Sequence, residues 1–211
     1  MTAGPVSSTE GTMGAVYSTA SYVDAVASSH PTPGGGSVAG VVGALAAALG
    51  EMVCRLSPSS GDTKIDQSMS DALAGFNTAR ETLLHLAAGD EAAYGLFRSA
   101  SSMPKRSPEE KSSRSEAMQD ALLGAALVPI ATASASRALL PEIIHIATFG
   151  NRHVRSDAMI ASILALAAVR SCAVNVHVNT AMLRDTTRAT ELEQEIGAIV
   201  ADASRLAAQL D

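Results

Sequence analysis

The amino-acid sequence predicts an all-α protein, a single-domain bundle of long antiparallel helices. Apolar residues follow the three- and four-residue spacing of helices over most of the chain, and alternating strand patterns are scarce. Residues that favour helix starts and stops punctuate these segments. No internal repeat of about 20 to 50 residues is visible, so a solenoid is not expected. With 211 residues, the chain suits one well-buried domain.

Two regions are expected along the chain. Residues 1–14 are predicted to be a flexible N-terminal tail, because they are mostly polar and their one charged side chain is Glu10. They lack the basic start and apolar stretch of a signal peptide. Residues 15–211 are predicted to form the helical domain.

Three helices are predicted in the first half of this domain. A short helix is expected to end near Ser29, with Ser18 or Ser21 as its N-cap. Ser37 is expected to cap a second helix, which is made of small residues. A long third helix is predicted from about Lys64 to Ser101, where the apolar residues are periodic.

The next helix is predicted to start at Ser107-Pro108-Glu109-Glu110. This motif combines an N-cap serine, a proline at the first helical position and a capping-box glutamate. After Pro141, a separate short helix is expected to reach Gly150, because glycine suits a left-handed stop.

The C-terminal part is predicted to contain two more helices. Asn151 to Arg155 are expected to form a loop, after which Ser156 caps a helix that runs from Asp157 to about Leu183. A last helix is predicted from Thr187 to Leu210.

Charge and aromatic content limit the expected partners. Lys and Arg number 15 against 21 Asp and Glu, so the net charge is −6 and no surplus of cations exists for nucleic acid or an anionic membrane. Aromatic residues make up 3% and tryptophan is absent, which removes the stacking platforms of single-strand binders. We expect no nucleic acid partner and no membrane partner.

The residue types that bind metals are scattered along the chain. Cys54 and Cys172 form no C-x-x-C pair, so neither a zinc site nor a disulfide is indicated, and a cytoplasmic location is expected. The histidines form no H-x-x-x-H or H-E-x-x-H pattern: His30, His85, His145, His153 and His177. No metal is predicted.

The stretch HPTPGGGSVAGVVGALAAALG, from His30 to Gly50, joins three glycines to a run of small apolar residues. Glu51 and Arg55 interrupt the run before the roughly 20 apolar residues that a bilayer span requires, so no span is expected. Small residues recur on one helical face: Gly36, Gly40, Gly43, Ala47 and Gly50. We expect another helix or subunit to approach this face closely, as in a homodimer.

The glycine turn itself indicates a ligand contact. A Walker loop is excluded because Ser37 follows Gly36 where that motif needs lysine, and a hydrolase nucleophile is not indicated because G-x-S-x-G is absent. The glycines let the backbone lie against a ligand, and the helix N-terminus favours an anion such as a carboxylate. A valine at Gly35 is therefore expected to impair ligand binding or assembly more than folding.

Several short motifs follow one another along the chain: Pro31-Thr32-Pro33-Gly34-Gly35-Gly36-Ser37, Asp90-Glu91-Ala92-Ala93-Tyr94, Met103-Pro104-Lys105, Ser107-Pro108-Glu109-Glu110, Val128-Pro129, Gly150-Asn151 with Ser156-Asp157, and Asn175-Val176-His177-Val178-Asn179. In order and spacing they resemble the formiminotetrahydrofolate cyclodeaminase and methenyltetrahydrofolate cyclohydrolase family. The resemblance covers about Tyr22 to Leu206. It implies an all-helical fold that assembles as a dimer.

The resemblance also implies an enzyme of folate one-carbon metabolism, with no cofactor beyond the folate substrate. Members of the family act on the one-carbon unit between two nitrogens of reduced folate. Cyclodeaminases expel ammonia from the formimino derivative, and cyclohydrolases open the methenyl bridge with water. Both reactions need a group that moves a proton, which a positioned carboxylate does for about 10²–10⁴-fold in rate.

Asp90 matches the family's catalytic aspartate and is predicted to move this proton. Tyr94, four residues on, shares its helical face and is expected to border the ligand. Burial and the neighbouring Glu91 are expected to raise the proton affinity of Asp90. Further residues are predicted to bind the substrate: Pro33, Gly34, Gly35, Gly36, Ser37, Tyr94, Asn151, Ser156, Asp157, Asn175 and Asn179. For Asp157 a helix-dipole role stays open, as does mutual hydrogen bonding for the last two asparagines.

Two departures from the family pattern leave the substrate open. Ala88 stands where a second acid is common, and Ser57 to Ile65 replaces a basic segment, which leaves Lys64 as the nearby cation. One alternative is the same fold acting on a non-folate cyclic amidine or a substrate of specialised metabolism. The other is a catalytically inert helical dimer or binding module.

Overall fold

The structure, a computed structural model, describes residues 18–210, so the expected tail over residues 1–14 lies outside the described residues. This part of the chain contains no strand, and its helices are α1 (Thr19–Val26), α2 (Gly35–Arg55), α3 (Thr63–Ser101), α4 (Pro108–Phe149), the 3₁₀ turn η1 (Arg152–Val154), α5 (Arg155–Thr180) and α6 (Thr186–Ala207). The predicted all-α class is confirmed.

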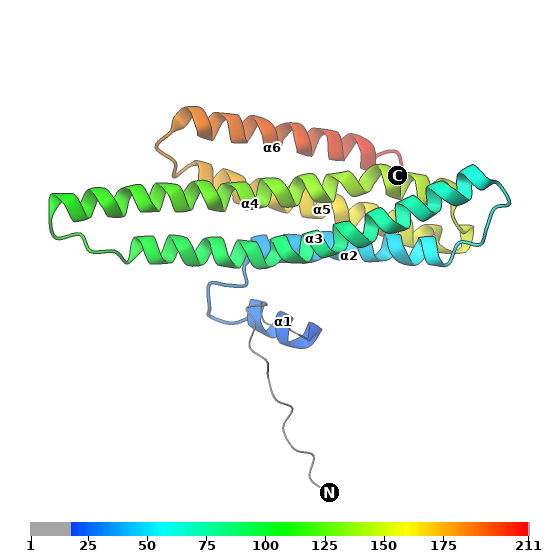
Figure 1. The fold of residues 1–211 in the computed structure, drawn as a ribbon, viewed down its shortest axis with the longest axis horizontal. Coiled ribbons are helices and arrows are strands. Elements are labelled where there is room, and N and C mark those ends of the chain that lie inside the picture. The colour runs from blue at the N-terminus through cyan, green and yellow to red at the C-terminus, as the bar shows by residue number, and fades with distance from the viewer. Residues whose placement is uncertain (1–17, 211) are drawn as a thin grey trace, which may run out of the picture.

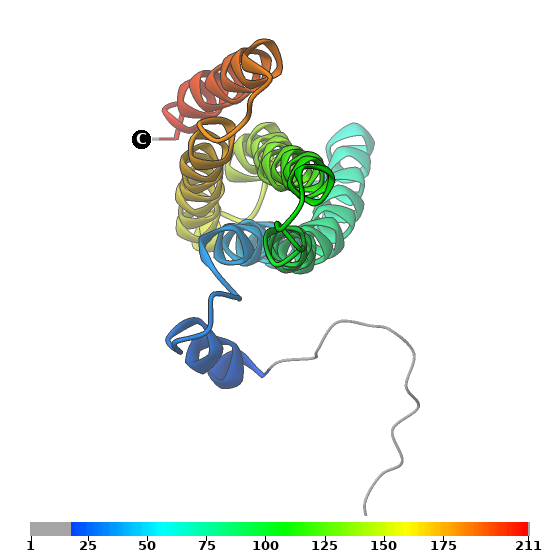
Figure 2. The same ribbon diagram turned by 90° about the vertical axis from the view of Figure 1, so that its left-hand side faces the viewer.

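Helices α2 to α5 form a four-helix bundle in which consecutive helices run antiparallel (Figure 1). Helix α2 packs against α3 and α5, and α4 packs against the same two helices, so the four surround one core. Helix α6 packs on α4 and α5, whereas α1 stands outside the bundle near the start of α2 (Figure 2).

The glycine-lined face of α2 brings that helix close to its neighbours in the same chain. A Cβ built at Gly40 would lie 2.9 Å from the Cβ of Ala87 on α3, and one built at Gly43 would lie 2.6 Å from Ser136 Oγ on α4. Glycine is required where backbones approach this closely. The expected close approach is confirmed, but it occurs within one chain, so this face does not argue for a homodimer.

Local capping signals locate two helix starts correctly. Ser18 caps α1, and Ser107 caps α4 through a capping box that Glu110 completes. The last two helices end within a few residues of their predicted ends, since α5 stops at Thr180 and α6 at Ala207. The starts of α1 and α4 depend on contacts within a single turn, so all the residues that make them stand in one short stretch of sequence.

Two other predicted caps are wrong. Helix α2 already begins after Gly34, so Ser37 lies inside its first turn. Ser156 likewise lies inside α5, which follows directly on η1 after Val154. In both cases the helix begins before the serine. The serine is therefore already a helical residue, and its side chain has no free N–H to cap.

Helix α4 is continuous over 42 residues although Pro129 and Pro141 lie within it, so the separate helix expected after Pro141 is wrong. Packing against α3 and α5 overrides the local preference of proline to end a helix. The side chain of Asn179 on α5 donates at 2.8 Å to the Ala125 carbonyl, the group that the missing N–H of Pro129 leaves unpaired. Gly150 is extended, at φ −79° and ψ −174°, so the left-handed stop is also wrong.

Three helical segments of the described chain are long and apolar enough, by length and composition, to cross a membrane: α2, α4 and Arg152–Thr180. The expectation that α2 is too short for this is therefore wrong, since the helix has 21 residues. Its apolar stretch is 61% buried in the bundle, and the buried Glu51 is paired with Arg55 and Arg80. The absence of a membrane partner stays a prediction.

Candidate active site

The N-terminus of α2 meets the second half of α3 at Asp90. The backbone N–H of Ser37, in the first turn of α2, donates to Asp90 Oδ2 at 3.0 Å. The carboxylate thus satisfies an N–H group that has no partner within its own helix, and it complements the positive end of the α2 dipole. Asp90 takes the capping role that the sequence assigned to Ser37.

Gly36 provides the space that the Asp90 carboxylate occupies. A Cβ built at Gly36 would lie 2.0 Å from Asp90 Oδ1. At the exposed Gly35, by contrast, a Cβ would lie 3.9 Å from Asn175 Oδ1, which is an ordinary contact. Of the predicted glycines, Gly36 is therefore the one that lies directly against Asp90, and the expected effect of valine at Gly35 stays a prediction.

The buried hydroxyl of Ser37 links two further residues to this site. It donates to Glu91 Oε1 at 3.1 Å and lies 3.0 Å from the Tyr22 hydroxyl on α1. Neither residue was predicted as a site residue. Glu91 is adjacent to Asp90 in the sequence, which is a usable signal, but no sequence pattern connects Tyr22 with Ser37.

Burial raises the pKa of Asp90 above the usual value for aspartate. The Ser37 N–H opposes this effect, and the charge of Glu91 adds to it. Burial also raises the pKa of the Cys172 thiol on α5 to about 12, with a contribution from the charge of Asp90. Cys172 therefore stays protonated at neutral pH, and Asp90 holds a proton to higher pH than an exposed aspartate does.

Several predicted binding residues lie at the same end of the bundle as Asp90. Tyr94 follows Asp90 by one turn of α3 and is 37% exposed, and Asn175 Oδ1 faces Gly35. Pro33 is buried, and its peptide bond with Thr32 is cis. Asn179 is also near, but its amide is engaged with the carbonyl of Ala125.

The other predicted binding residues lie at the far end of α2. The backbone N–H of Asn151 donates to Ser57 Oγ and its Nδ2 donates to the Leu56 carbonyl, both at 2.8 Å. Ser156 and Asp157 follow in the first turn of α5. Since 21 helical residues span about 30 Å, these three residues do not meet Asp90 within one chain. Their substrate role stays a prediction.

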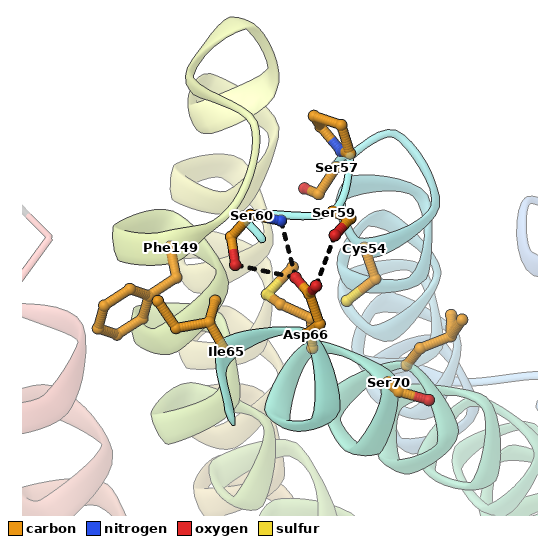
Figure 3. Close-up of a pocket in the computed structure, with 11 residues that line it drawn as sticks. Cys54, Ser57, Ser59, Ser60, Ile65, Asp66, Ser70 and Phe149 are labelled. Carbon is orange, nitrogen blue, oxygen red and sulfur yellow. Dashed lines mark hydrogen bonds between the residues drawn. The ribbon is translucent and has the colours of Figure 1, made fainter. Parts of the chain in front are cut away.

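A cavity of about 260 Å³ lies at that far end, between the end of α2, the start of α3 and Phe149 (Figure 3). Inside it, Asp66 accepts hydrogen bonds from Ser59 Oγ at 2.5 Å and from the N and Oγ of Ser60 at 2.8 and 2.9 Å. These bonds lower the pKa of Asp66. The carboxylate therefore orders the serine-containing loop between α2 and α3.

A second cavity of about 450 Å³ lies between α5 and α6. Its lining is mostly apolar, with Arg170 and two serines, and Asp90 lines neither cavity. Within residues 18–210, no group of three His, Cys, Asp or Glu side chains is arranged to hold a metal ion.

Known proteins are similar to this chain both in sequence and in fold. The family model described as formiminotransferase-cyclodeaminase matches residues 18–198. The chain is 36% identical to the methenyltetrahydrofolate cyclohydrolase of Methylorubrum extorquens, over 88% of this chain and 89% of that one. It is 30% identical to the formimidoyltransferase-cyclodeaminase of Sus scrofa, covering 89% of this chain but 35% of that protein.

The crystal structure of formiminotetrahydrofolate cyclodeaminase from Thermotoga maritima superimposes with a TM-score of 0.82. Sequence identity is 31%, and the match covers 92% of this chain and 93% of that one. The fold and the site define an all-helical protein with a partly buried carboxyl of raised pKa at the N-terminus of α2. The chain belongs to the formiminotransferase-cyclodeaminase family.

Proposed function

We propose that this chain is a folate one-carbon enzyme that hydrolyses methenyltetrahydrofolate. The observation that carries the proposal is the Asp90 carboxyl, which is partly buried, of raised pKa and held by the first turn of α2. The full-length similarity to the Methylorubrum extorquens cyclohydrolase supports hydrolysis as the reaction.

In this hydrolysis, Asp90 accepts a proton from the attacking water while the water oxygen bonds to the methenyl carbon. A neutral tetrahedral carbon between two nitrogens results. Asp90 then gives its proton to one nitrogen as the bond between that nitrogen and the carbon breaks. The hydroxyl becomes the formyl carbonyl and loses its proton to water. One carboxyl thus serves as base and then as acid, and a pKa raised above the usual value for aspartate favours the second of these steps.

Ammonia release from formiminotetrahydrofolate is the second candidate, favoured by the structural similarity to the Thermotoga maritima enzyme. Here the free folate nitrogen attacks the formimino carbon, and Asp90 takes the proton of that nitrogen. Asp90 passes the proton to the departing amino group, which leaves as ammonia. The proton path has the same two steps, so one site geometry suits both reactions.

We propose that the enzyme works in the cytoplasm as a homodimer, with no metal, no cofactor beyond folate, and no nucleic acid or membrane partner. The dimer contact would use the α2–α5 face, defined as Leu45, Ile160, Ile163, Val174 and Val178. These apolar side chains are 47–63% exposed, and α2 packs beside α5. A second copy would remove their surface from water.

A two-fold axis at this face also accounts for the separated binding residues. Leu45 is the central residue of α2, so an antiparallel contact at Leu45 exchanges the two ends of the helix. The partner subunit's Asn151 and the partner's Asp157 would then lie beside Asp90. The proposed site is in this way shared between two copies.

The experiment is an assay of the purified full-length chain on both folate derivatives, in buffer that contains a metal chelator. Methenyltetrahydrofolate is followed by its absorbance and formiminotetrahydrofolate by ammonia release. We expect turnover of the methenyl compound at the higher kcat/KM. If neither compound reacts, and formyltetrahydrofolate at millimolar concentration gives no heat in calorimetry, a non-folate substrate or an inert binding module is the better account.

A further inference from the structure

Tyr22 on α1, Ser37 on α2 and Glu91 on α3 form a chain of hydrogen bonds beside Asp90. We propose that Tyr22 and Glu91, joined through the Ser37 hydroxyl, are positioning residues that hold a negative charge next to Asp90 and keep its carboxyl in place. Since these roles concern the same carboxyl, they depend on the proposed function.

The direction of this chain of hydrogen bonds follows from counting the hydroxyl protons. A hydroxyl has one proton, and Ser37 donates its own to Glu91 Oε1. Tyr22 must therefore donate in its 3.0 Å contact with Ser37 Oγ. The chain runs from Tyr22 through Ser37 to the carboxylate of Glu91. A hydrogen bond to a carboxylate is stronger than one between neutral groups, so the linked hydroxyls hold the Glu91 side chain beside Asp90.

The two adjacent carboxyls therefore have different surroundings. Glu91 accepts from a hydroxyl that is itself polarised by a phenol, whereas the partly buried Asp90 accepts from a backbone N–H. The groups that meet Asp90 and its neighbour Gly89 from the other helices are uncharged: Gly36 and Ser37 on α2, Val128 on α4 and the Cys172 thiol on α5. The one charge beside Asp90 in this set is Glu91. The charge of Glu91 raises the pKa of Asp90, so Asp90 is the carboxyl to which we assign the exchangeable proton.

Tyr22 also makes α1 part of the site. None of the residues Thr19–Val26 is buried, and α1 stands outside the bundle (Figures 1 and 2). Its tyrosine nevertheless reaches the buried hydroxyl of Ser37, directly after the residue that accommodates the Asp90 carboxylate. A helix that adds nothing to the core therefore supplies a hydrogen-bond donor to the site.

The charge on Glu91 is tested by Glu91→Gln, because the amide still accepts from Ser37 but carries no charge. We expect the proton affinity of Asp90 to fall about 3- to 10-fold, measured by ¹³C NMR of its carboxyl in the ligand-free full chain. The acidic limb of kcat/KM should move to lower pH with it. Glu81→Gln, at an exposed position on the same helix, is the matched control and should leave both unchanged. An unaltered Asp90 titration in Glu91→Gln would overturn the proposal.

The link through Ser37 is tested by a double-mutant cycle. Tyr22→Phe keeps the ring and removes the donor, so we expect kcat to fall about 3- to 10-fold with little change in KM. In a Ser37→Ala background, the same change should alter neither kcat nor the Asp90 titration. Additive effects would contradict the link. The NMR titration needs no turnover. Inactivity on both folates would therefore reject the proposed function, while the titrations would still show whether the hydrogen bonds from Tyr22 to Glu91 act on Asp90.

Discussion

The Asp90 carboxylate fits beside the α2 backbone because Gly36 has no side chain. The carboxylate fills the position that a side chain at Gly36 would need. Gly36→Ala therefore forces Asp90 away from the Ser37 N–H. The displaced group is the end of a side chain, so the helices need not separate. We expect kcat to fall about 10²-fold, with a melting temperature close to that of the wild type.

Gly35→Ala is the matched control, since its Cβ has room beside Asn175. Steady-state kinetics and thermal unfolding of both variants provide the comparison. Near wild-type turnover in Gly36→Ala, or equal losses in the two variants, would show that the position of Asp90 does not depend on this glycine.

For single residues, the sequence was enough to select Asp90 and the glycine turn as candidates, because both belong to short motifs. It did not show which of the three glycines lies against Asp90, since that depends on where α3 places this carboxylate. Tyr22 was missed for a similar reason. It reaches Ser37 through space, and its own surroundings in the sequence carry no motif.

Among the helices, the continuity of α4 depends on a side chain from another element. Asn179 on α5 satisfies the Ala125 carbonyl that Pro129 leaves without a helical partner. Asn179→Ala should leave this carbonyl unpaired and lower the free energy of unfolding by about 1–3 kcal/mol, measured by urea denaturation.

Pro129→Ala provides the control for this prediction, because alanine restores the N–H that pairs with the Ala125 carbonyl. In that background, the cost of Asn179→Ala should be much smaller. An equal cost in both backgrounds would mean that Asn179 stabilises the bundle by some other contact.

The contrast between the predicted and observed helices has a physical explanation. The start of α4 at Ser107 was predictable because a capping box is complete within four residues. The continuation of α4 past Pro141 could not be predicted, because local rules stop a helix at proline, whereas packing against two neighbouring helices sustains it. The start of α2 was misplaced because its cap comes from Asp90, which is 53 residues away.

For the whole molecule, the proposed homodimer predicts a mass of about 43 kDa in solution, twice the 21.5 kDa of one chain. Leu45→Glu places a charge at the centre of the α2–α5 face and should give the monomer mass by light scattering. Leu84→Glu, an exposed leucine on α3, is the control and should remain dimeric. A wild-type protein of monomer mass at micromolar concentration would contradict the dimer.

If the site is shared between two copies, the Leu45→Glu monomer should also lose turnover although its Asp90 site is intact. Activity measured at the concentrations used for light scattering tests this. A fully active monomer would show that one chain carries the complete site and that Asn151 and Asp157 have structural roles alone.

The central claim is that Asp90 carries the proton, and Asp90→Asn tests it most directly. Asparagine keeps the size of the side chain and an oxygen that accepts the Ser37 N–H, but it cannot take up a proton. We expect turnover of methenyltetrahydrofolate to fall by about 10²-fold or more, while the affinity for formyltetrahydrofolate measured by calorimetry changes little. Turnover at the wild-type rate would contradict the assignment.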